Sequence, residues 1–232
     1  MTEPLDAALA TALAAIDGWG AQHAAAAVVG PDGVVASHGD PARSFGWASV
    51  TKLVTALAML TALEDDIIDL DAPAGPPGST VRHLLAHASG LPFEGEEPIA
   101  RPGTRRIYSN PGFDRLGELL AERDGVSPGV ALGRRVLVPL GMAGTDLVSR
   151  VSEGLHGPLA DLAALARELL APTLVAPATL ESATMVVFPG LPGVLPGVGR
   201  FDPLDWGLGF ELRDGKQPHW TGTRNSPETF GH

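Results

Sequence analysis

A helical pattern of apolar residues runs from Gly46 to Leu63 and stands out from the rest of the chain. Apolar side chains recur there every three or four residues, and most of the remaining positions are alanine, threonine or methionine. Because such a helix has no strongly polar face, we predict that it is buried. The acidic residues Glu64, Asp65 and Asp66 that follow oppose the helix dipole, so the helix should end near Leu63.

Ser49 and Lys52 lie in the first turn of this predicted helix. Three residues apart, they share one face at hydrogen-bonding range. A serine hydroxyl is a weak nucleophile until a base takes its proton, and burial together with the positive end of the helix would lower the pKa of Lys52 enough to make it that base. The alternative is a capping serine followed by a lysine that extends to the surface. The pair alone is a weak signal.

The segments on either side of this helix differ in type. An amphipathic helix is predicted over residues 4–17, and the β-compatible runs 23–29 and 34–38 form a hairpin around the turn Pro31-Asp32-Gly33. Helical patterns then predominate, beginning near Thr80, Pro111, Pro128, Leu159 and Pro177. Strand-like sequence returns at 206–212, 216–221 and 229–232.

This order of elements predicts one domain with two lobes, spanning residues 1–232. A sheet lobe would comprise residues 1–48 and 201–232, and a helical lobe residues 49–200. Residues 188–205 are rich in proline and glycine, and we expect them to form an irregular surface loop.

Two further motifs carry candidate chemistry. Tyr108 and Asn110 lie just before the helix that begins near Pro111, in the kind of loop that often presents functional side chains. His83 and His87 are four residues apart, a spacing that can hold a metal ion. No third ligand is evident nearby, so we favour a structural role for His87 and predict no metal site.

The amino-acid composition excludes several classes of partner and of catalysis. The formal net charge of −11, without a basic cluster, argues against nucleic acid or an anionic membrane as partner and leaves a small molecule or a peptide. The chain has no cysteine, which excludes disulfides and thiol catalysis. It shows neither a signal peptide pattern nor a membrane-spanning run, so we expect a cytoplasmic protein. Nucleotide-binding fingerprints are incomplete, and we expect no cofactor.

With Ser49-Val50-Thr51-Lys52 and Tyr108-Ser109-Asn110 both present, the chain resembles the penicillin-recognising serine hydrolases of the class C type. This family includes class C β-lactamases, D-alanyl-D-alanine carboxypeptidases and related esterases. The resemblance extends over the segments 84–92, 102–104 and 206–210, in the expected order along nearly the whole chain. It implies an α+β fold of the β-lactamase/transpeptidase type, in which helices flank an antiparallel sheet and an all-helical lobe is inserted.

The resemblance also implies roles for individual residues. Ser49 would be the acylated nucleophile, and its backbone N–H would contribute to the oxyanion hole. Lys52 would share its proton with Tyr108, whose phenolate would act as base and then protonate the leaving group. Asn110 would bind the substrate amide or Lys52.

The third family motif, Lys-Thr-Gly or His-x-Gly, is where this sequence departs. Only His232 matches it, at the first position, and we expect His232 to face the substrate. The motif glycine, further strands and the closing helix would lie beyond, so we expect either a truncated sequence or an impaired catalyst. Two hypotheses therefore stand: a serine hydrolase acting on a β-lactam, a D-amino-acid peptide or a small ester, and a family member that binds ligand without turnover.

Overall fold

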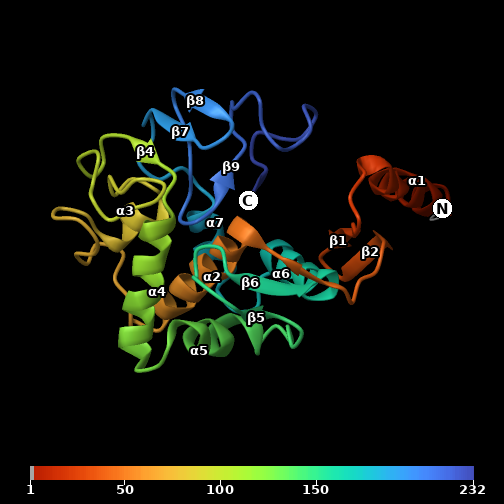
Figure 1. Ribbon diagram of the computed structural model, residues 1–232, viewed down its shortest axis with the longest axis horizontal. Helices are drawn as coiled ribbons and strands as arrows, with labels where there is room; N and C mark the ends of the chain where they lie inside the picture. The colour runs from red at the N-terminus through yellow and green to blue at the C-terminus, as the bar shows by residue number, and fades with distance from the viewer. Residues whose placement is uncertain (1–2) are drawn as a thin grey trace.

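A computed structural model describes residues 3–232, and it combines helices with short strands (Figure 1). The helices are α1 Glu3–Leu13, α2 Thr51–Glu64, α3 Val81–Leu85, α4 Asn110–Asp124, α5 Pro128–Leu132, α6 Leu159–Leu170 and α7 Pro177–Ala183. The strands are β1 Ala26–Gly30, β2 Gly33–His38, β3 Ser44–Gly46, β4 Arg106–Ile107, β5 Asp146–Leu147, β6 Leu155–Pro158, β7 Gly193–Leu195, β8 Gly199–Phe201, β9 Glu211–Leu212 and β10 Phe230–Gly231.

Helix α2 is the centre of the hydrophobic core. Every residue from Thr51 to Leu60 is buried, as the absence of a polar face predicts, and the helix packs against α4 and α5. A 3₁₀ turn, Ala48–Val50, precedes it, so the predicted helix is present but begins with a tighter turn. It ends at Glu64, one residue beyond the predicted end.

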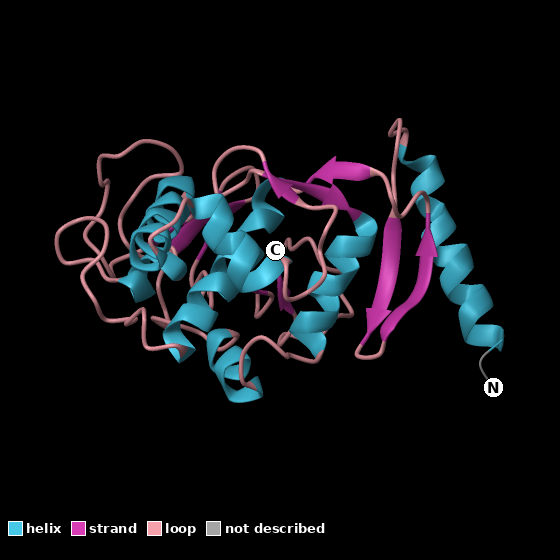
Figure 2. Ribbon diagram, turned by 90° about the horizontal axis from the view of Figure 1, so that it is seen from below, coloured by secondary structure: helices cyan, strands magenta, loops and turns pink. Residues whose placement is uncertain are grey.

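Short strands form four small sheets. The hairpin β1–β2 lies with α1 at one side of the molecule, where α6 contacts it (Figures 1 and 2). Strand β6 lies between β3 and β5, β7 lies between β4 and β8, and β9 pairs with β10. All pairs are antiparallel except β4 with β7.

Short strands also occur within residues 49–200, the range of the predicted helical lobe. Strands β4 to β7 lie there and β8 ends just beyond it at Phe201, and each has only two to four residues. Elements of this length are too short to show an alternating pattern, and β4 and β6 also pair with strands that are distant in sequence, β7 and β3 respectively. Pairing in the folded chain, rather than local propensity, therefore defines them.

Residues 188–205 also differ from expectation, because β7 and β8 form a hairpin there. Gly197 and Gly199 have φ angles of +73° and +149°, which allow the chain to reverse between the two strands. Residues 216–221, expected to be a strand, form an irregular, bent segment instead. The Lys216 ammonium donates to the Asp205 and Leu212 carbonyls, and these bonds hold the start of the segment.

The segment 206–210 precedes β9 and packs against the hydrophobic core. Gly209 donates its N–H to the Leu85 carbonyl of α3 (3.1 Å) and lies against Ala56 of α2. Its φ of +89° is accessible to glycine and rarely to other residues. A Cβ at this position would lie 2.3 Å from the Cβ of Ala56, so only glycine fits.

Gly209→Ala should therefore destabilise the protein by at least about 2 kcal/mol, since it combines a steric clash with backbone strain. Gly215→Ala is the matched control, because a Cβ there has no heavy atom within 4 Å and the φ angle is not positive. Chemical denaturation of both variants measures the difference. Equal stabilities would show that the α2 contact does not constrain position 209.

Candidate active site

Five side chains singled out from the sequence meet at the N-terminal end of α2. Ser49 lies in the 3₁₀ turn and Lys52 in the first turn of the helix. Tyr108 follows β4, and Asn110 is the first residue of α4. His232 follows β10, whose end reaches the start of α2 (Figure 1).

The chain around Ser49 is fixed by the segment 151–158. Trp47 donates its indole N–H to the Gly157 carbonyl (3.1 Å), and Thr51 accepts from the Leu155 N–H (3.0 Å). Ala48 has a φ of +45°, a strained value for a residue with a Cβ. These contacts and this turn present Ser49, half-buried, at the surface of a cavity.

Lys52 is fully buried and has three oxygen neighbours. Its Nζ lies 2.6 Å from Asn110 Oδ1, 2.8 Å from the Ser152 carbonyl and 3.2 Å from Ser49 Oγ. The first two oxygens can only accept hydrogen bonds, whereas the serine hydroxyl can also donate. An ammonium satisfies all three by donating to each, and a neutral amine satisfies them by donating to the two carbonyl oxygens and accepting from the Ser49 hydroxyl.

Burial lowers the pKa of Lys52 to about 7, and the Glu153 and Asp114 carboxylates oppose this shift. A large fraction of Lys52 is then an amine at neutral pH. The geometry and the pKa agree, and Lys52 is placed to accept the Ser49 proton. The alternative of a surface lysine is wrong, because the side chain is buried.

Tyr108 and His232 form the opposite side of the site. Burial lowers the pKa of His232 to about 3, so its ring is neutral, and its Nε2 and the Tyr108 hydroxyl share a hydrogen bond of 2.7 Å. Burial also raises the pKa of Tyr108, although a hydrogen bond with Ser49 opposes this. A resting phenolate, which the resemblance implied, is therefore disfavoured here, and Lys52 is the better base.

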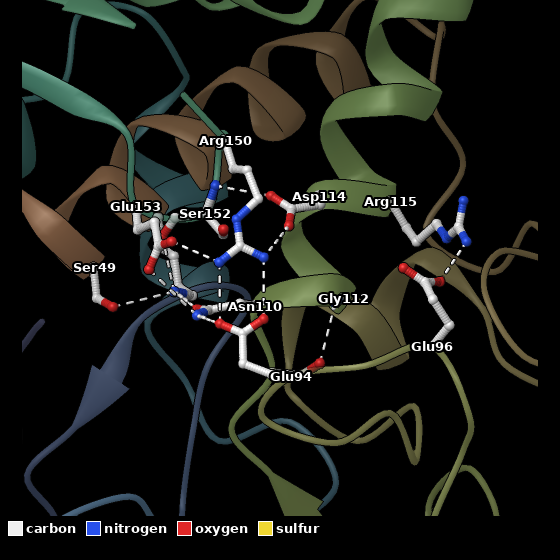
Figure 3. Close-up of polar contacts among 12 residues, drawn as sticks. Ser49, Glu94, Glu96, Asn110, Gly112, Asp114, Arg115, Arg150, Ser152 and Glu153 are labelled. Atoms are coloured by element: carbon white, nitrogen blue, oxygen red, sulfur yellow. Dashed lines mark hydrogen bonds and ion pairs between the residues drawn. The ribbon is translucent and has the colours of Figure 1, made fainter. Parts of the chain in front are cut away.

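Asn110 is held by a cluster of charged residues that the sequence did not reveal. Its Nδ2 donates to Glu94 Oε1 (2.7 Å), and Arg150 pairs with Glu94 through two bonds of 3.0 Å. Figure 3 shows that Arg150 also faces Asp114 and Glu153. Asn110 is buried and both ends of its amide are engaged, and its contact with Lys52 is one of the two contacts that the resemblance implied.

Ion pairs of this kind are difficult to recognise from a sequence. Glu94 and Arg150 are 56 residues apart and lie on two loops without regular structure. Only the spacing of Arg150 and Glu153, which form an (i, i+3) pair, gave a local signal. The loops come together because both pack at the start of α2 and α4.

His83 and His87 do not converge on a common point. His83 Nδ1 contacts the Thr80 hydroxyl (2.9 Å) and its ring stacks on Phe188, whereas buried His87 accepts the Ser109 N–H (3.1 Å). Within residues 3–232 no group of three or more His, Asp or Glu side chains is arranged to hold a metal ion. No helix in this range is long and apolar enough to cross a membrane.

A family model described as beta-lactamase matches residues 14–232. The chain belongs to the beta-lactamase family. This match confirms the family resemblance and the fold class that the motifs predicted. The family is one of serine hydrolases.

The fold of this chain is similar to the folds of solved structures. A beta-lactamase from Mycobacterium bovis is 52% identical, with a TM-score of 0.93 over 95% of this chain and 82% of that chain. A D-stereospecific amidohydrolase from Streptomyces sp. is 20% identical, with a TM-score of 0.71 over 89% and 83% of the two chains, and supports the fold alone.

A curated relative is the acyltransferase calJ from Penicillium decumbens, which is 31% identical over 118 residues. The alignment spans 40% of this chain and about a quarter (25%) of the relative's length.

The site predicts a pH dependence for the reactivity of Ser49. Labelling of Ser49 by a fluorophosphonate should accelerate as pH rises through about 7, because the fraction of Lys52 present as amine increases. Glu153→Gln should move this midpoint to lower pH, since the Glu153 charge favours the ammonium. The labelling reaction is quenched at successive times, and intact-mass measurement of the labelled fraction gives the rate at each pH.

Glu122→Gln is the control, because it removes the same charge from an exposed position in the last turns of α4. A midpoint near 10 in the wild type, or equal midpoints in the two variants, would contradict the assignment of Lys52 as a buried amine.

Proposed function

We propose that this protein is a serine hydrolase that forms an acyl-enzyme at Ser49. The observation that carries the proposal is the position of the buried Lys52 Nζ, which lies 3.2 Å from Ser49 Oγ while the Asn110 Oδ1 and the Ser152 carbonyl oxygen occupy two of its other directions. Membership of the beta-lactamase family supports the same chemistry. The substrate classes are a β-lactam, a D-amino-acid peptide or a small ester.

The proposed acylation begins with transfer of the Ser49 proton to Lys52. Ser49 Oγ then bonds to the substrate carbonyl carbon, and the oxyanion that forms would be stabilised by the Ser49 backbone N–H. Collapse of this intermediate breaks the bond to the leaving group, which takes up the proton held by Lys52. Tyr108 is suited to relay that proton, because its hydroxyl hydrogen-bonds with Ser49.

Deacylation would use water in place of the leaving group. The Lys52 amine or Tyr108 accepts a proton from the water, whose oxygen attacks the ester carbonyl. The bond to Ser49 Oγ then breaks, and the serine recovers its proton. The net reaction is hydrolysis of one acyl bond.

Ester and peptide substrates suit this site better than a β-lactam. A permanently charged lysine in the third motif would bind the carboxylate of a β-lactam. Here His232 stands at that position, and burial lowers its pKa to about 3, so it offers no charge. The Mycobacterium bovis relative is named a beta-lactamase, and a chromogenic β-lactam therefore belongs in the same assay as the ester.

Ser49→Ala should abolish both fluorophosphonate labelling and hydrolysis of p-nitrophenyl acetate. Ser152→Ala is the control, because the buried Ser152 contacts Lys52 only through its backbone carbonyl, which the substitution retains. Peptide mapping identifies the labelled residue. Labelling of another serine in Ser49→Ala would refute the assignment, and an unreactive wild type would favour the alternative of a family member that binds ligand without turnover.

Tyr108→Phe should lower the acylation rate by about 10²–10⁴, the usual effect of losing a positioned acid or base. The ring and its packing against His87 and Trp206 are retained, so thermal stability should change much less than the rate. Single-turnover kinetics and a melting curve on the same preparation separate the two effects. An unchanged rate in folded protein would leave Lys52 as the only proton carrier.

A further inference from the structure

His87 occupies a position in the fold that ordinarily belongs to glycine. It follows the C-terminal end of α3 with a φ of +53°. Its N–H donates to the Leu84 carbonyl (3.1 Å), and the Ala88 N–H donates to the His83 carbonyl (2.8 Å). These two bonds form a Schellman motif, whose left-handed residue is usually glycine and sometimes asparagine. A histidine there carries backbone strain, and departures of this kind are expected mainly at functional sites.

The contacts of His87 hold Tyr108 from both directions along the chain. The His87 backbone carbonyl accepts the Ile107 N–H (2.8 Å), and its Nδ1 accepts the Ser109 N–H (3.1 Å). The imidazole also packs on the Tyr108 ring, with 4.5 Å between the two ring centres. One residue therefore binds both chain neighbours of the tyrosine and contacts its ring.

The imidazole of His87 is in the protonation state that this arrangement needs. Because Nδ1 accepts the Ser109 N–H, it carries no proton, and the proton of a neutral ring is then on Nε2. Burial is the main cause that holds the pKa of His87 well below its usual range, so the ring is neutral. Nε2 has no hydrogen-bond partner in the described chain, and the bond from Nδ1 alone orients the side chain.

The placement of the Tyr108 hydroxyl depends on how this part of the chain is held. The hydroxyl hydrogen-bonds with Ser49 and lies 2.7 Å from His232 Nε2. Tyr108 itself lies between α4 and β4, and β4 has only two residues, so regular structure gives its backbone little support. A displacement of about 1 Å in a catalytic group can cost about 10²-fold in rate.

We propose that His87 is a positioning residue for Tyr108. Through its bonds to the residues before and after the tyrosine, it keeps the phenol hydroxyl within hydrogen-bonding reach of Ser49. This accounts for a histidine where the Schellman motif favours glycine. His87 does not line the cavity beside Ser49, so it acts only through Tyr108. The use of the hydroxyl in proton transfer rests on the proposed function, whereas the placement of Tyr108 by His87 does not.

Two substitutions at position 87 test the bond to Ser109. His87→Phe keeps an aromatic ring but has no acceptor, whereas His87→Asn keeps an acceptor at the place of Nδ1 and tolerates the left-handed conformation. Fluorophosphonate labelling of Ser49 should slow by about 10–100-fold in His87→Phe and by much less in His87→Asn. His83→Asn is the matched control on the same helix, since the His83 ring stacks on Phe188, and it should label at the wild-type rate.

A double substitution separates positioning from a general loss of structure. Tyr108→Phe already lacks the hydroxyl, so adding His87→Phe should slow labelling no further. The same slowing in both backgrounds would overturn the proposal, as would a wild-type rate in His87→Phe or equal rates in His87→Phe and His87→Asn. If His87→Phe does not fold, His87→Leu, which also lacks an acceptor, takes its place.

Ionisation of Tyr108 gives a readout that needs no catalysis. Tyr108 is the only tyrosine of the chain, so the ultraviolet absorbance of tyrosinate reports on it alone. Burial raises its pKa, and wild-type Tyr108 should remain largely protonated at pH about 10, where an exposed tyrosine is half ionised.

The ionised fraction should rise in His87→Phe, because a less firmly held ring gains access to water, and circular dichroism at the same pH verifies that the variant is folded. Equal ionised fractions in the wild type and folded His87→Phe would overturn the proposal. A raised fraction in a protein whose Ser49 is unreactive would support the placement of Tyr108 by His87 and refute the acyl-enzyme, so the two proposals can fail separately.

Discussion

The buried amine of Lys52 is the constraint on which the rest of the site depends. An ammonium group without exposure to water needs several oxygens around it, and the structure supplies Asn110, Ser152 and Ser49. Burial favours the neutral form, while the nearby carboxylates moderate the shift. The balance leaves the pKa of Lys52 at about 7, and a general base is most effective when its pKa is close to the operating pH.

Holding this amine requires parts of the chain that have no regular structure of their own. The loop that carries Ser152 is tied to α2 through the Thr51 and Thr55 hydroxyls. The Arg150 and Glu94 pair then holds the Asn110 amide from the solvent side. Exposed ion pairs contribute little to global stability, so we interpret this one as fixing the orientation of Asn110.

The opposite wall of the cavity is built on a different principle. There Glu211 Oε1 and His219 Nε2 lie 3.3 Å apart as a pair, and Trp220 and Thr221 contact the other polar atoms of the two side chains.

The sequence by itself determined the central helix and the positions of Ser49 and Lys52 on one face, because helical geometry fixes neighbours three residues apart. It also predicted helices that begin near Leu159 and Pro111, and α6 and α4 begin at Leu159 and Asn110. Tertiary structure alone decided the Arg150 cluster, the lowered pKa of Lys52 and the pairing of Glu211 with His219. The Arg150 cluster and the surroundings of Lys52 bring together segments distant in sequence, where burial and long-range contacts set the energies and local propensity carries no information about them.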